Sequence, residues 1–209
     1  MAKLKHLQDL IPRIAQVDEG RARVLVMKAR ASGHFTTGGR GVNAPDVVPA
    51  DAVSALLLCL HMDAPTEAGE GVADLKSLPL DHVKFNPGDG TFRDVNPEVF
   101  PTDSLPAAFG KALPATLADA LAILFSRADS FENRWDKIEF SRHSQRQEVK
   151  LYLADKDYTR NDWDEVYRAW EFVFQPETLA SYDELGCWIN KTIHGEALRA
   201  LRDLVKGGS

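Results

Sequence analysis

The feature that most constrains this chain is residues 18–43, where an amphipathic pattern ends at a glycine and continues into a glycine-rich stretch. Asp18 is a residue type that caps the start of a helix, and Gly33 stands where a left-handed residue ends one. Four apolar residues between them recur at helical spacing: Ala22, Leu25, Val26 and Ala29. The pattern predicts one helix that buries this stripe and then stops abruptly.

The predicted helix carries cations on both sides of the face opposite that stripe. Two pairs, each seven residues apart, flank this face: Arg23 with Arg30, and Arg21 with Lys28. The face between the flanks carries small or apolar residues: Val24, Met27 and Ala31. A helix with a small-residue face edged by cations suits insertion into a DNA major groove. The alternative is an ordinary amphipathic helix whose cations are only solvated.

A short extended piece and a sharp turn follow the helix. His34 to Thr37 can extend, and the sequence Gly38-Gly39-Arg40-Gly41 can turn tightly with Arg40 at its tip. Helix and turn together have the outline of a recognition helix with a wing, although an ordinary loop fits the same residues. The predicted DNA contacts are Arg21, Arg23, Lys28, Arg30, Thr36, Thr37 and Arg40.

Charge is distributed unevenly along the 209 residues. The net charge of −6 argues against a protein that coats nucleic acid non-specifically. Residues 1–43 nevertheless contain eight Lys or Arg and three Asp or Glu, a net charge of +5, so the remainder carries −11. Such asymmetry favours a nucleic-acid surface at one end of the chain.

The segment ARASGHFTTGGRGVNAPDVVPADAVSALLLCL resembles winged-helix regulators of the MerR-like or excisionase-like kind, and phage or prophage proteins with the same outline. The resemblance covers residues 3–62. It implies a DNA-binding domain in which the recognition helix and the wing arginine contact double-stranded DNA. It also implies a transcriptional regulator of phage or prophage type.

The rest of the chain predicts mostly helices. Helical spacing appears over residues 3–16, where Pro12 either bends one helix or separates two, and over residues 49–62. Alternation predicts one antiparallel hairpin, residues 137–142 with 147–153. Further helices are predicted from Asn161 to Phe174 and over residues 181–205. The expected fold is α+β and mainly α: a winged-helix-like domain (1–62), a connection (63–112) and a helical module with one hairpin (113–209).

No catalytic or metal-binding constellation emerges from the sequence. The acidic run from Asp155 to Asp164 has Arg160 where a calcium loop needs glycine, and Val166 where it needs glutamate. His143 and Ser144 lack the spacing of a base and its nucleophile. We therefore expect no enzyme, no cofactor and no metal.

Location and partners follow from the remaining features. No apolar run is long enough for a membrane span, and no secretory signal is recognisable. Cys59 and Cys187 lie in apolar contexts that are typical of free thiols, so we expect a cytoplasmic protein. The aromatic residues of 163–174 suggest core or, for part of them, a subunit interface, and hence a homo-oligomer, a dimer if the DNA site is two-fold. Two alternatives stay open: a small-terminase-like DNA-packaging subunit, and an acidic anti-defence factor that binds another protein and no DNA.

Overall fold

A computed structural model describes residues 2–38, 45–61, 65–95, 109, 113–126, 135–143, 146–154, 169–176 and 188–207. Within them the helices are α1 (Leu4–Ala15), α2 (Glu19–Ala31), α3 (Pro49–Leu60), α4 (Ala68–Ser77), α5 (Leu117–Ser126) and α6 (Gly195–Lys206). A short 3₁₀ helix, η2 (Pro65–Glu67), precedes α4. The strands are β1 (Leu80–Asn86), β2 (Arg93–Val95), β3 (Trp135–His143), β4 (Arg146–Ala154), β5 (Ala169–Phe174) and β6 (Trp188–His194).

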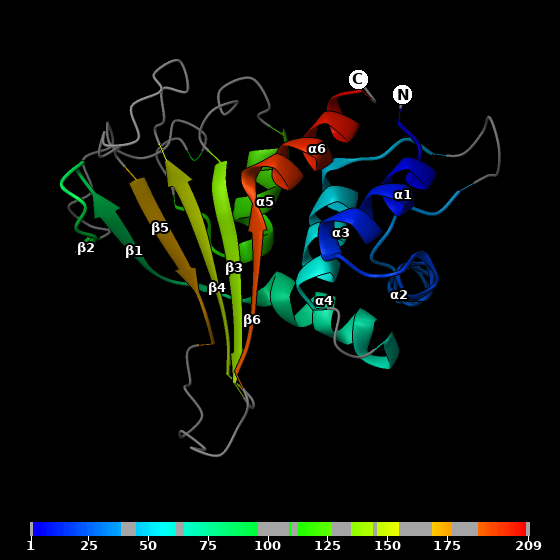
Figure 1. The fold of residues 1–209 in the computed structure, drawn as a ribbon, viewed down its shortest axis with the longest axis horizontal. Coiled ribbons are helices and arrows are strands. Elements are labelled where there is room, and N and C mark those ends of the chain that lie inside the picture. Colours follow the sequence, from blue (N-terminus) through cyan, green and yellow to red (C-terminus); the bar gives the residue numbers. More distant parts are fainter. Residues whose placement is uncertain are drawn as a thin grey trace.

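The strands form one sheet in the order β2-β1-β5-β4-β3-β6, and every neighbouring pair is antiparallel. The predicted hairpin is confirmed as β3 and β4, in which Phe140 pairs with Val149. A row of buried residues crosses five strands on one face: Val83, Phe172, Leu151, Ile138 and Ile193. The helices gather on one side of the sheet (Figure 1). This apolar face is therefore the wall of the core.

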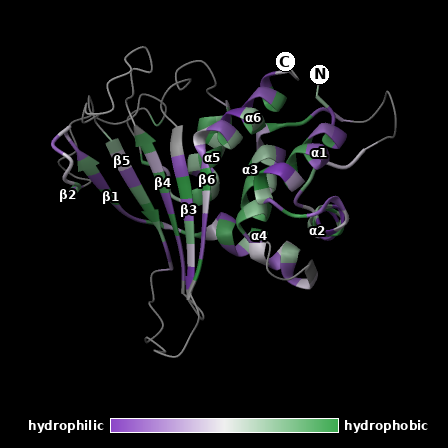
Figure 2. Ribbon diagram, viewed as in Figure 1, coloured by the Kyte–Doolittle hydropathy of each residue, from purple (hydrophilic) through white to green (hydrophobic). Residues whose placement is uncertain are grey.

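Helix α3 is the centre of the helical layer. All its residues from Asp51 to Leu60 are buried, and it contacts α1, α2, α4, α5 and α6. Figure 2 shows hydrophobic residues along α3 and α5. A helix that is apolar all round is stable only when other elements enclose it. The predicted helix over 49–62 is confirmed, with Pro49 in its first turn, where proline is favourable.

The two N-terminal helices follow local signals closely. Helix α1 is continuous through Pro12, which decides between the two alternatives left by the sequence. In α2 the Asp18 side chain accepts the Arg21 backbone N–H at 2.8 Å, so the predicted cap is confirmed. The predicted stripe of α2 is buried, and Gly33 has a φ of +80° after the helix end. Local caps and spacing were sufficient to predict this helix.

The expectation of a mainly α fold with one hairpin is wrong, because the structure contains a sheet of six strands. Residues 169–174, expected in a helix, form β5, and residues 188–194, also expected in a helix, form β6. Strand β5 is almost wholly buried, so its apolar run matches a buried helix as well as a strand. Pairing with β1 and β4 decides for the strand.

Residues 65–95, within the predicted connection, contain η2, α4, β1 and β2. One cluster of buried apolar residues joins elements on both sides of the connection, from Leu7 in α1 to Leu201 in α6. The division of the chain at residues 62 and 113 stays a prediction.

Candidate nucleic-acid interface

Helices α1 and α2 follow each other along the chain and pack together at the edge of the helical layer (Figure 1). Three residues, 16–18, connect them, and Gln16 takes a left-handed conformation with a φ of +55°. The Val17 N–H donates to the Pro12 carbonyl at 3.2 Å, which closes the turn tightly. A turn of three or four residues also joins the two helices of the helix-turn-helix motif of DNA-binding proteins, whose second helix enters the major groove.

The outward face of α2 is as the sequence predicted. The cations Arg21, Arg23, Lys28 and Arg30 are all exposed on α2. Between them Val24 is 41 % exposed and Met27 is 57 % exposed, two of the few large apolar residues at the described surface. Singly exposed apolar residues are ordinary at a protein surface, and here two of them share one helix face with the four cations. We call this surface the α2 face.

The segment after α2 is held in place by a buried carboxylate. Asp51, which is 2 % exposed, accepts the Thr36 N–H at 2.7 Å and the Val48 N–H at 3.1 Å. Its two oxygens thus join the chain before and after residues 37–47. Thr36 is half-buried and Thr37 is exposed, and residues 34–38 form no strand. Arg40, the predicted tip of a wing, lies outside the described residues.

His34 anchors the same segment to α4. Its Nε2 lies 2.7 Å from the Gly69 carbonyl oxygen, and its Nδ1 lies 3.4 Å from Lys76 Nζ. Burial lowers the pKa of His34, and the neighbouring Lys76 lowers it further, against the effect of the Gly69 hydrogen bond. Burial also lowers the pKa of Lys76, while the Asp51 carboxylate opposes that shift. Distant residues therefore fix where the chain leaves α2.

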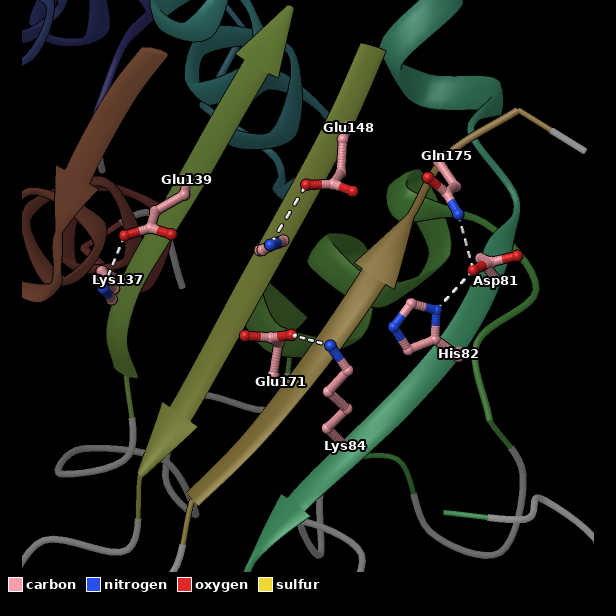
Figure 3. A network of polar contacts seen from close by, with 9 residues as sticks. Asp81, His82, Lys84, Lys137, Glu139, Glu148, Glu171 and Gln175 are labelled. Atoms are coloured by element: carbon pink, nitrogen blue, oxygen red, sulfur yellow. Dashed lines mark hydrogen bonds and ion pairs between the residues drawn. The ribbon is translucent and has the colours of Figure 1, made fainter. Parts of the chain in front are cut away.

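A second polar cluster covers the sheet face away from the helices (Figure 3). Three glutamates on it each have a lysine partner: Glu171 with Lys84 at 3.3 Å, Glu139 with Lys137 at 2.6 Å, and Glu148 with Lys150 at 3.3 Å. Tyr152 lies among them, and burial, then its hydrogen bond to Glu171, raises its pKa. Because these charges compensate one another, the face offers no field that would attract a polyanion.

Near one end of this face, Asp81 accepts a hydrogen bond from Gln175 at 2.8 Å and lies 2.5 Å from the His82 ring nitrogen. Sequence reasoning missed this network. The alternation of residues 137–153 indicated one polar hairpin face, but Glu171 and His82 join it only through the pairing of β1, β5 and β4.

Some of the other candidates derived from the sequence lie within the described residues, and the rest lie outside them. Cys59 is buried on α3, and burial raises its pKa to about 12, so it is an unreactive thiol. In the described ranges no three His, Cys, Asp or Glu side chains lie where they could share a metal ion. Ser144, Cys187 and the acidic run from Asp155 to Asp164 lie outside them. Trp170 and Phe174, for which the sequence left the core and a subunit interface open, are buried within this chain.

Among the described helices none combines the length and apolar character of a membrane span. No family model, curated protein or solved structure matches the chain.

Proposed function

We propose that this protein binds double-stranded DNA through the α2 face, as a sequence-specific regulator of phage or prophage type. The observation that carries the proposal is the α2 face itself: exposed cations edge an exposed apolar strip on the second of two helices joined by a three-residue turn. Its buried stripe holds the helix against the core, so the cations are not needed for packing. Phosphate neutralisation by such cations supplies much of the affinity for DNA.

The position of each cation along α2 suggests its role. In helix-turn-helix proteins the N-terminal residues of the second helix contact base edges. Arg21 and Arg23 stand in that half of α2, so we assign them to base edges, while Lys28 and Arg30 would contact phosphates. Thr36 and Thr37 follow the helix and would add hydrogen bonds to the backbone. The resemblance to winged-helix proteins adds Arg40 as a further contact.

The test compares two charge-neutralising variants in a DNA-binding assay. Fluorescence anisotropy would measure Kd against a duplex selected from a random-sequence library, over a salt series. Arg30→Gln should weaken binding of all duplexes and reduce the salt slope by about one, as the loss of one phosphate contact does. Arg23→Gln should instead relax specificity at one base position.

Arg93→Gln is the matched control, because Arg93 is exposed in β2 at the opposite side of the molecule from α2 (Figure 1). It changes net charge equally but should leave both Kd and slope unaltered. If Arg30→Gln and Arg93→Gln behave alike, or if the parent selects no duplex, the α2 face does not bind DNA.

One observation favours a second function for the same surface. Val24 and Met27 are exposed apolar residues on the α2 face, and methionine is common at protein-binding surfaces. The second candidate is therefore a protein partner docked on the α2 face. Met27→Asp should abolish capture of a protein partner and should also weaken DNA binding, because it adds a negative charge to the same face, so it is the parent's selection of a duplex that separates the two candidates. A parent protein that selects no DNA but loses such a partner in Met27→Asp would establish the second candidate.

A further inference from the structure

A pocket of about 280 Å³ opens where the end of α4 meets one end of the sheet. Six residues from four parts of the chain line it: Asp74, Ser77, Leu78, Pro79, Gln147 and Pro176. The first two belong to the last turn of α4, and the next two link α4 to β1. Gln147 comes from β4, and Pro176 follows β5. The volume fits one short aliphatic chain with a polar head.

The electrostatics of the pocket favour a cation. Asp74 is exposed, and among the described residues no cation lies within ion-pair distance of its carboxylate. It stands in the last turn of α4, where the carbonyl ends of the helix carry partial negative charge. Carboxylate and helix end therefore add their potentials at one side of the pocket.

Gln147 supplies a second acceptor that the described fold leaves unused. Its Oε1 atom is buried and has no hydrogen-bond donor. A buried acceptor without a partner is costly, and most such atoms in native proteins are satisfied by protein, water or ligand. Apart from Ser77, whose hydroxyl donates to the Asp74 backbone carbonyl at 2.9 Å, the remaining walls are apolar: Leu78, Pro79 and Pro176. The pocket thus combines two acceptors with a lining that suits methylene groups.

We propose that this pocket binds an alkylammonium or guanidinium group, with its N–H groups donating to Asp74 and Gln147 and its methylene stem against the prolines. Such a group occurs in free amines and in lysine or arginine side chains of other proteins. Charge-assisted hydrogen bonds to a carboxylate are the strong ones, so Asp74 supplies most of the affinity. The pocket does not involve α2, and this site stands whether or not the α2 face binds DNA.

The experiment is an NMR titration of the full-length chain with 1,4-diaminobutane, followed through backbone amide shifts. Saturable shifts are expected at Ser77, Leu78 and Gln147. The neutral 1,4-butanediol, equal in length, should produce none. Asp74→Asn should weaken the affinity for the amine about tenfold or more, because a charged hydrogen-bond partner is lost. Because Asp74 is exposed, this variant should have the same melting temperature as the parent protein.

Two controls make the result specific. Asp9→Asn removes the same charge from an exposed position on α1 and should leave the titration unchanged. Gln147→Leu tests the second acceptor and should weaken binding of the amine. It should leave the fold intact, because it removes a buried atom that has no hydrogen-bond partner. If the diol shifts the same amides as the amine, or if Asp74→Asn and Asp9→Asn bind equally, the pocket is only a solvent-filled hollow.

Two further ligands distinguish the source of the cationic group. Agmatine represents a free amine, and Nα-acetyl-arginine amide represents a side chain presented by another protein. Tighter binding of agmatine identifies a small-molecule site, and tighter binding of the blocked arginine identifies a protein docking site. If agmatine, the blocked arginine and diaminobutane all fail to bind, the proposal is overturned.

Discussion

Asp51→Asn should destabilise the protein far more than the chemically identical change at Asp119. Both aspartates stand at the third position of a helix, Asp51 in α3 and Asp119 in α5. Asp51 is 2 % exposed and accepts two backbone N–H groups, from Thr36 and Val48. Asp119 is exposed and accepts from the Thr116 N–H at 3.1 Å and its hydroxyl at 2.8 Å. Burial is therefore the main difference between the two sites.

The expected magnitude follows from those contacts. An asparagine at position 51 keeps one acceptor oxygen, so one backbone N–H in this part-buried site loses its partner, at a cost of about 1–3 kcal/mol. Loss of the negative charge at the start of α3 adds about 0.3–1 kcal/mol. It also withdraws the carboxylate that favours the charged form of Lys76. We expect Asp51→Asn to lower the free energy of unfolding by about 2–4 kcal/mol in total. Asp119→Asn should lower it by less than about 1 kcal/mol, because water replaces the lost contact.

Urea unfolding followed by far-UV circular dichroism would measure both free energies of unfolding. Amide hydrogen exchange would report the site directly, because the Thr36 N–H should exchange faster in Asp51→Asn and be unaffected in Asp119→Asn. Equal losses of stability in the two variants would refute the argument that Asp51 holds the chain on both sides of residues 37–47.

Three further predictions concern α2, His34 and Cys59. Leu25→Ala removes a fully buried side chain and should lower the free energy of unfolding by about 2–5 kcal/mol, whereas Met27→Ala on the same helix should change it by less than about 0.5 kcal/mol, both measured in urea. The pKa of His34 is lowered in the fold, so the unfolded chain takes up its proton first, and stability should fall as pH drops below about 6.5; His34→Gln should show a smaller loss between pH 7.5 and 5.5. Cys59 is buried and its pKa is raised to about 12, so in the variant Cys187→Ser it should resist alkylation until denaturant is added. Rapid labelling of the native protein would contradict its burial.

Short-range signals in the sequence were enough to predict α2, α3 and the hairpin of β3 and β4. The cap at Asp18, the stripe including Leu25 and the positive φ at Gly33 depend on residues within a few positions of one another. Likewise the hairpin needs only alternation on both sides of a short connection. The exposure of the four cations of α2 follows from the same stripe, since burying one side of a helix leaves the other outward.

Only the tertiary structure decided the six-stranded sheet and the two sites that join distant residues, the one around Asp51 and the pocket beside α4. The apolar run of β5 suits a buried helix or a central strand, and its pairing with β1, more than 80 residues earlier in the chain, selects the strand. Asp51 meets Thr36 across 15 positions, and Gln147 shares a pocket with Asp74 from another layer. Such contacts depend on how whole elements pack and not on local spacing. Helix periodicity can therefore place a cation on an outer face, but only packing can bring an unpaired carboxylate and a buried acceptor to one pocket.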